Sequence, residues 1–394
     1  MRFSLSLSLM LWLASFAVGC AESGTSCGKK ALLLWPDAKG EYQFQSVPLS
    51  TSPHRLKSEA AEVYFDAAYS PSGYRGGVAE PRLTNSNGLC VPMDADSSLA
   101  VNAFAQFESL HRFEKRLGTV SQLSWPRKVG VQIRMQDQNG LSHNNAHYIS
   151  DFDVIAVVPF SQPGLPLALN QGILAHEHFH AHFQSQVLLR LDRLRPVISW
   201  VENLFNPLFP MKPTPDQTGD DLWSVVGMNS FVLRGWNEGL ADLFGSIYTG
   251  DPEIMGESIP QLAASRSLLG PVGPLFTGAD VRNVLVRSLN PRKSLMDMSY
   301  QQGTQLARLL YRLASIHPED APAFLRRLML RLPEIAPRIE PRYKSGVMDF
   351  EMILPILLGD QVDELDDEAC GLIEQVVSKA MMQSEFARCL NKSY

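Results

Sequence analysis

The sequence lacks an excess of basic residues, since it contains 35 Lys and Arg against 41 Asp and Glu and has a formal net charge of −6. The charges are scattered, and such a chain offers no footprint for nucleic acid or for polybasic membrane binding. Internal repeats, low-complexity tracts and, after residue 18, any apolar run of about 20 residues are also missing. What remains is a chain of 394 residues, enough for a sizeable core in one two-lobed domain or in two close-packed domains.

Apolar residues are concentrated at the start of the chain, from Phe3 to Val18. This run is short for a bilayer-spanning helix and ends in small residues, which is typical of an export signal. We therefore expect residues 1–19 to be removed, which would delete Arg2 and leave a net charge of −7. Export would place the protein in the cell envelope.

The residues at the end of this run, Ala17-Val18-Gly19-Cys20, resemble a bacterial lipobox. The resemblance implies that Cys20 becomes an acylated first residue, that residues 20–30 form a tether and that the lipid anchors the protein to a membrane. Ala21 follows, which by the same resemblance indicates the outer membrane of a two-membrane bacterium. The same residues also fit an ordinary signal cleavage site.

Cysteines are scarce, and their number bears on this choice. Lipidation of Cys20 would leave an even set, suited to disulfides in an oxidising compartment: Cys27, Cys90, Cys370 and Cys389. The sequence does not determine their pairing, although Cys370 and Cys389 are close enough in the chain to join the last two helices.

The strongest chemical signal is the stretch LAHEHFHAHF at residues 174–183. Residues four apart on a helix share one face, so His176 and His180 can offer two imidazole nitrogens to one cation. Zinc suits two imidazoles, a carboxylate and one open position. Glu177, one step round the helix, can reach a water on that cation and take its proton as the water attacks a carbonyl. The H-E-x-x-H spacing therefore indicates a zinc-dependent hydrolase.

A second histidine pair, His178 and His182, lies four residues apart on another face of the same stretch. This pair lacks the following glutamate, because Phe179 stands in its place. A histidine-rich helix at the surface that binds metal adventitiously is therefore the alternative to a zinc site. Apolar neighbours such as Leu174 and Phe183 favour a buried active-site helix.

A third ligand is available in the stretch GWNEGLADLFG at residues 235–245, which predicts a second helix. Its Glu238 and Asp242 are again four apart on one face. A carboxylate at Glu238 would complete a His2Glu site for one zinc ion per chain, and Asp242 could accept a hydrogen bond from the far nitrogen of a ligand histidine. The other interpretation is an amphipathic helix with two exposed acids.

HEHFH followed by WNEGLADLFG resembles the gluzincin metallopeptidases, which are the thermolysin-like enzymes and their aminopeptidase relatives, whose third ligand lies in an N-E-x-x-x-D stretch. The resemblance implies an α+β, zincin-like, two-lobed metallopeptidase with a mixed-sheet upper lobe that carries the active-site helix and a mainly helical lower lobe. The corresponding division is an upper lobe at residues 31–183, an insert at 184–234 and a lower lobe at 235–394. This insert is longer than the family's usual spacer, and it either roofs the cleft or forms a helical hairpin without a catalytic role.

The segments before HEHFH fit the same order of elements. Apolar residues recur at helical spacing from Ser97 to Leu117, alternate as in a strand from Val129 to Met135, and form a buried strand from Val154 to Val158. Between the two strands, NNAHY resembles the edge strand that binds extended peptide in thermolysin-like enzymes, which implies that Asn145 and Ala146 contact the substrate backbone. A plain turn into a strand is the alternative.

The stretch SYQQG at residues 299–303 precedes a further helical run, TQLARLLYRLAS. It resembles the Tyr-x-x-Gly that opens a helix in the aminopeptidase branch, which implies that Tyr300 steadies the tetrahedral oxyanion. A tyrosine that only packs at the start of the helix is the other interpretation. The G-x-M-E-N-like exopeptidase motif of that branch is missing before HEHFH, so we expect endopeptidase or carboxyl-side action.

Together these patterns predict an exported, zinc-dependent metallopeptidase that acts on a peptide or protein substrate. Two other classes stay open: a zinc hydrolase of non-peptide amides or esters, since such a site polarises any carbonyl, and a non-catalytic cell-envelope binding protein that keeps the zinc as a strut. The intact Glu177 favours catalysis, because a structural site has no use for a base. The sequence does not indicate an oligomeric state.

Overall fold

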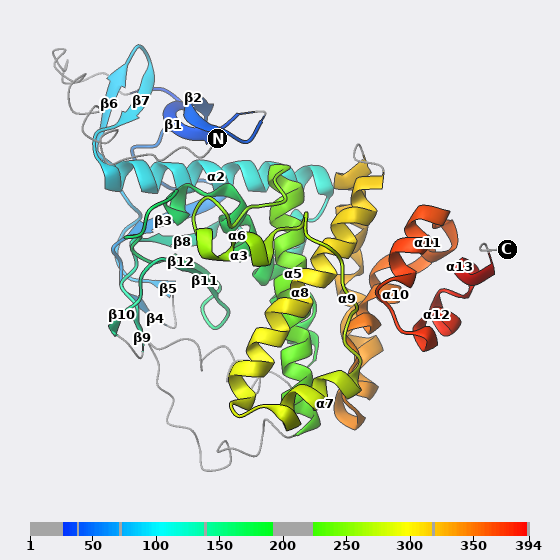
Figure 1. The fold of residues 1–394 in the computed structure, drawn as a ribbon. Helices are drawn as coiled ribbons and strands as arrows, with labels where there is room; N and C mark the ends of the chain where they lie inside the picture. The colour runs from blue at the N-terminus through cyan, green and yellow to red at the C-terminus, as the bar shows by residue number, and fades with distance from the viewer. Residues whose placement is uncertain are drawn as a thin grey trace.

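The computed structural model describes residues 27–37, 39–70, 73–137, 140–191, 224–316 and 320–391. In these residues the strands all lie between Lys30 and Val157, and helices dominate the chain that follows (Figure 1). This mixture confirms the predicted α+β class. The expected signal peptide at 1–19, Cys20 and most of the tether lie outside the described residues.

Two four-stranded sheets contain most of the strands. The first has the order β2-β1-β7-β6, formed by β1 (Lys30–Pro36), β2 (Tyr42–Pro48), β6 (Leu83–Ser86) and β7 (Leu89–Pro92). The second has the order β11-β12-β8-β3, formed by β3 (Ala61–Phe65), β8 (Arg127–Val131), β11 (Ala146–Ile149) and β12 (Val154–Val157). Two short hairpins pair β4 (Tyr69–Ser70) with β5 (Gly73–Tyr74) and β9 (Gln136–Asp137) with β10 (Gly140–Leu141).

The second sheet is mixed, and its edge strand β11 packs against the helix α3 (Gln171–Gln186). β3, β8 and β12 are parallel, whereas β11 runs antiparallel to β12 and forms the edge, as the sequence predicted. The alternating run that begins at Val129 ends as a strand at Val131, because Gln132 adopts a left-handed backbone with φ 58°. Ile133 and Met135 stay buried beyond the end of the strand.

One long helix, α2 (Ala95–Leu117), crosses above the second sheet and packs against strands of both sheets (Figure 1). It was predicted from Ser97, and it begins two residues earlier. Asp94 caps its start by accepting the backbone N–H of Ser97, and Gly118 ends it with a left-handed φ of 73°.

The two sequence motifs form neighbouring helices, α3 (Gln171–Gln186) and α5 (Val225–Thr249), and α5 also packs against α8 (Pro291–Ile316). Glycines allow the α5 and α8 backbones to touch. A Cβ on Gly303 of α8 would lie 2.5 Å from the carbonyl oxygen of Gly235 on α5, and a Cβ on Gly239 would meet the Gly303 carbonyl. Substitution at these glycines would push the two helices apart and shift the residues between them.

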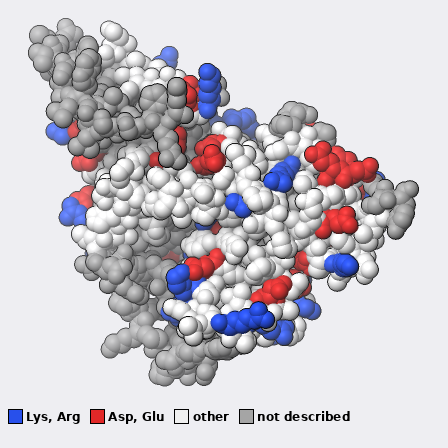
Figure 2. All heavy atoms as spheres, viewed as in Figure 1, with Lys and Arg blue, Asp and Glu red and all other residues white. Residues whose placement is uncertain are grey.

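The remaining helices complete the carboxyl-terminal part of the chain. They are α6 (Pro260–Arg266), α7 (Gly278–Arg287), α9 (Ala321–Ser345), α10 (Ile353–Leu358), α11 (Asp367–Glu374), α12 (Lys379–Glu385) and α13 (Ala387–Asn391). None of the helices in the described ranges is long and apolar enough to cross a membrane. Charged side chains of both signs are scattered among uncharged ones on the described part of the face in Figure 2.

The four cysteines other than Cys20 are paired in two disulfides. Cys27–Cys90 ties the segment before β1 to β7, and Cys370–Cys389 joins α11 to α13. The sequence interpretation had this bond joining the last two helices. In the structure it joins α11 to α13 instead, and α12 lies between them.

The predicted insert at 184–234 differs from the structure at both ends. α3 ends at Gln186, three residues inside the expected insert, and a short 3-10 helix at Leu188–Arg190 follows. α5 begins at Val225, ten residues before the predicted start at Gly235, so the last part of the expected insert belongs to this helix. Residues 192–223 lie outside the described residues.

Candidate metal centre

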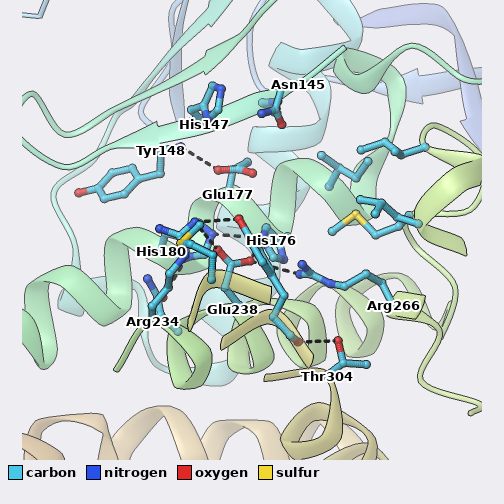
Figure 3. A pocket seen from close by; sticks show the side chains of 18 of the residues that line it. Asn145, His147, Tyr148, His176, Glu177, His180, Arg234, Glu238, Arg266 and Thr304 are labelled. Carbon is cyan, nitrogen blue, oxygen red and sulfur yellow. Dashed lines mark hydrogen bonds and ion pairs between the residues drawn. The ribbon is translucent and has the colours of Figure 1, made fainter. Parts of the chain in front are cut away.

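The three proposed zinc ligands converge. His176 and His180 lie one turn apart on α3, and Glu238 approaches them from α5 (Figure 3). His176 Nε2 lies 3.1 Å from His180 Nε2 and 3.6 Å from Glu238 Oε2. One ligand atom of each residue lies within 4.8 Å of the others, so this buried group could hold a metal ion.

The far nitrogens of both imidazoles face oxygen acceptors. Asp242 Oδ1 lies 2.9 Å from His176 Nδ1, and Asn237 Oδ1 lies 2.9 Å from His180 Nδ1. These acceptors favour a hydrogen on each Nδ1 and leave both Nε2 atoms with lone pairs that point at each other. The two Nε2 atoms lie 3.1 Å apart, so their lone pairs repel unless both face a proton or a cation. Two imidazoles and a carboxylate are a donor set that fits a zinc-like dication.

Arg266, at the end of α6, holds the carboxylates behind the cluster. Its Nε and Nη2 donate to Asp242 at 2.8 and 2.6 Å, and Nη2 also donates to Glu238 Oε2 at 3.3 Å. Asp242 is almost completely buried, and burial alone would raise the pKa of its carboxyl, yet Arg266 and His176 hold that pKa well below its usual range. Glu238 likewise keeps a lowered pKa against burial, chiefly because of Arg266.

The two histidines differ in their protonation. Burial alone would lower the pKa of His176, but the Asp242 carboxylate raises it above its ordinary value. Burial and the neighbouring His176 lower the pKa of His180 to about 4. His180 is therefore neutral at pH 7 and presents a free lone pair, as a metal ligand must.

Glu177 lies beside the cluster without joining its ligand group. Its Oε2 accepts a 2.7 Å hydrogen bond from the backbone N–H of Tyr148 on the edge strand β11 (Figure 3). Burial raises the pKa of the Glu177 carboxyl to about 7. A carboxyl that exchanges its proton near neutrality is suited to general acid–base work.

His176, Glu177, His180 and Glu238 all line one cleft of about 1090 Å³. Its wall includes Asn145, Ala146 and His147 of the β11 region as well as Arg234 and Tyr300. Burial lowers the pKa of His147 to about 4, so this imidazole is neutral. The cleft is large enough for several residues of an extended chain.

Tyr300 lies inside α8, nine residues after its start, and does not open a helix as predicted. It nevertheless lines the cleft, and its hydroxyl accepts a 2.7 Å hydrogen bond from Arg234 Nη2. The guanidinium carbons of Arg234 and Arg266 lie 5.2 and 5.3 Å from the centre of its ring. Burial raises the pKa of Tyr300, so its hydroxyl stays protonated at neutral pH.

Asn145 and Ala146 both line the cleft, but their backbones are already engaged in part. The Asn145 carbonyl accepts the backbone N–H of Val158, and the Asn145 side chain accepts that of Ala146 at 2.9 Å. The Asn145 carbonyl therefore faces the residue that follows β12, and the contact of Asn145 with a substrate backbone stays a prediction. Ala146 lies on the edge strand beside the cleft, as expected.

The second histidine pair is fully buried, contrary to the alternative of a surface helix. His178 and His182 both direct Nε2 at Glu114 of α2, at 2.6 and 2.5 Å. Glu114 was not singled out in the sequence, because no spacing links it to residues 64 and 68 positions later.

Protein-family models and curated proteins give no match to this chain. The assignment of the site therefore depends on its geometry. The structure adds three polar residues that the motifs did not assign: Arg234, Asn237 and Arg266. Arg234 lies four residues before Glu238 on α5, so helical spacing could have placed it beside the ligand, whereas Arg266 follows Asp242 by 24 residues without any such signal.

Proposed function

We propose that the protein is a gluzincin-type, zinc-dependent metallopeptidase that hydrolyses peptide bonds. One observation carries the proposal: His176, His180 and Glu238 converge on one point of a large cleft, while Glu177 stands beside that point with a different partner. A metal site that served only as a strut would need neither the open cleft nor the additional carboxylate.

Zinc, when bound by these three residues, supplies a Lewis acid that polarises a carbonyl and acidifies water. Glu177 acts as the general base. Because its Oε2 is occupied by the Tyr148 N–H, Oε1 takes the proton from the attacking water and then delivers it to the leaving amine.

Tyr300 is the second catalytic residue of the proposal. Its hydroxyl is protonated, lines the same cleft and can donate a hydrogen bond to the oxygen that becomes negative as the carbonyl is attacked. Arg234 donates to the same hydroxyl at 2.7 Å, which makes it a stronger donor and fixes its position.

The substrate of this proposal is an extended peptide or protein segment that lies along β11. This strand is the edge of its sheet and its residues line the cleft, which is where an extended substrate can lie alongside it. We propose endopeptidase or carboxyl-side cleavage in a two-lobed, zincin-like arrangement, with the β-rich part above the cleft and the helical part below it. Export and a lipid at Cys20 would place this activity in the bacterial cell envelope.

The test is zinc content measured beside cleavage of an unfolded protein substrate, with and without a chelator. We expect cleavage that stops on chelation, returns with zinc and is lost in Glu177→Gln. Cleavage at the full rate by metal-free protein would overturn the proposal. Hydrolysis of a small ester by zinc-loaded protein that leaves the unfolded protein intact would move the assignment to a non-peptide hydrolase.

Two further measurements address substrate and location. Release of free amino-terminal residues from short peptides, with blocked peptides spared, would contradict endopeptidase or carboxyl-side action. Cys20→Ser should move the protein from the membrane fraction to the soluble fraction without changing its folded domain. Recovery of this variant in the membrane at the parent level would contradict lipidation.

A further inference from the structure

The opposite face of α3 carries a second group of two histidines and a glutamate. His178 and His182 lie two residues beyond His176 and His180 and point away from the cleft, toward Glu114 on α2. All three side chains are completely inaccessible to solvent. Their ligand atoms lie within 4.8 Å of one another.

Gln122 determines which nitrogen of His182 carries the hydrogen. Its Nε2 donates to the Met329 carbonyl at 3.2 Å, so its Oε1 is the atom that lies 3.2 Å from His182 Nδ1. An acceptor at that place requires a hydrogen on Nδ1. The Nε2 of His182 then directs a lone pair at the Glu114 carboxylate, an arrangement that needs either an extra proton between the two groups or a cation that both groups bind.

The hydrogen bonding of Glu114 favours a cation over an extra proton. Both histidines approach Oε1, whereas Oε2 is buried and has no hydrogen-bond partner. A buried carboxylate oxygen without a partner costs free energy. Hydrogen bonds from both histidines to Oε1 do not offset this cost, because Oε2 still has no partner. A dication can engage both oxygens, and with His178 Nε2 and His182 Nε2 it then has four donor atoms, the number in structural zinc sites.

The surroundings exclude water and substrate. The ring centres of Trp125 and Phe107 lie 5.3 and 6.0 Å from that of His178, and the ring centre of Phe244 lies 6.3 Å from that of His182. None of the three residues of this group lines the cleft. An ion here would have no open position for chemistry.

We propose that Glu114, His178 and His182 form a second, structural binding site for a zinc-like dication. It would fasten the active-site helix α3 to α2 from behind, on the face opposite the cleft. The proposal does not depend on the peptidase function, because it concerns a different set of ligands.

The experiment is a metal count on the full-length purified chain, loaded with zinc and dialysed. We expect two zinc ions in the parent, one in His176→Ala/His180→Ala and one in Glu114→Gln, which keeps the shape of the side chain but removes its charge. The variant that combines all three substitutions should hold none. Circular dichroism of each variant checks that the helices remain.

The outcomes separate the two sites. If the His176→Ala/His180→Ala protein is folded but holds no zinc, the second site does not exist. If the parent then holds one ion, that ion is bound at the cleft site. A single ion that survives this double substitution but not Glu114→Gln would support the second site and count against the first. Should Glu114→Gln fail to fold, the double variant alone still decides, since it leaves Glu114, His178 and His182 intact. Zinc in the combined variant would show adventitious binding and overturn the assignment.

Discussion

Asp242 Oδ1 lies 2.9 Å from His176 Nδ1 and at the same time 2.6 Å from Arg266 Nη2. One carboxylate oxygen thus connects the imidazole that faces the cleft with a buried arginine. Arg266 also reaches Glu238, so a single guanidinium restrains one proposed zinc ligand and the carboxylate that faces another. Its positive charge keeps both carboxylates ionised and reduces the electron density that Glu238 can donate.

Arg266→Lys should weaken zinc binding by about 10- to 100-fold, the usual effect of removing a partner behind a metal ligand. Lysine cannot form the two parallel bonds to Asp242 and cannot reach Glu238 in the same geometry. The measurement is a zinc dissociation constant from competition with a chelator of known affinity.

Arg308→Lys is the matched control. Arg308 is also buried and donates to the backbone carbonyls of Ser267 and Pro271, but it contacts none of the acidic residues of the site. Equal losses of zinc affinity in the two variants would show that general packing, and not the Asp242 contact, explains the effect.

Glu238→Ala should release the zinc of the cleft, since a two-histidine site loses a bond and a negative charge. The expected result is one zinc ion fewer per chain than in the parent, with the helices retained. Glu334→Ala, on the outer face of α9 and 41% exposed, is the control and should keep the parent zinc content. Parent-level zinc in Glu238→Ala would remove Glu238 from the ligand set.

The ligand residues could be predicted because helical spacing is local. An i, i+4 pair shares a face wherever the helix lies, so His176 with His180 and Glu238 with Asp242 were accessible from the sequence. Their mutual contact was an inference from resemblance. It depends on the close packing of α3 on α5, which is a property of the tertiary structure.

Arg266 and Glu114 could not be predicted for the same reason. Each reaches the histidine helix from an element whose sequence has no periodic relation to HEHFH. The strand from Val129 was predicted too long, because a left-handed turn at Gln132 ends β8 without any Gly or Pro to indicate it. Helix starts were also placed too late, at Gly235 and at Tyr300, although Ser224 caps α5 and the Asn290-Pro291 pair at the start of α8 is a common helix-start signal.

In the metal-free protein, Glu177 contributes a stabilisation that decreases as the pH rises from about 5 to 8. Burial raises the pKa of Glu177 to about 7 from an ordinary value of 4.5, so the folded protein holds this proton more tightly than the unfolded chain. The resulting stabilisation is complete below pH 4.5 and is lost as the pH rises through 7. The loss amounts to at most about 3 kcal/mol.

Glu177→Gln isolates this contribution. The amide is neutral at every pH and can still accept the Tyr148 N–H, so metal-free Glu177→Gln and metal-free parent should be similarly stable at pH 5. At pH 8 the variant should be the more stable one by about 1 to 3 kcal/mol, measured by urea unfolding. A difference that does not change with pH would show that Glu177 titrates with its ordinary pKa.

With zinc bound, the same substitution should separate binding from catalysis. Glutamine preserves the shape of Glu177 and its bond to the edge strand but cannot take a proton, so the zinc content should equal that of the parent while turnover falls by about a hundredfold or more, the usual contribution of a positioned base. Tyr300→Phe, which removes only a hydroxyl in the same cleft, should also keep its zinc but lose less activity. The measurement is metal content beside turnover of one unfolded protein substrate. Full activity in Glu177→Gln would rule out the proposed peptidase mechanism. Loss of zinc in that variant would mean that Glu177 is a zinc ligand. Glu238 would then no longer be needed as the third ligand.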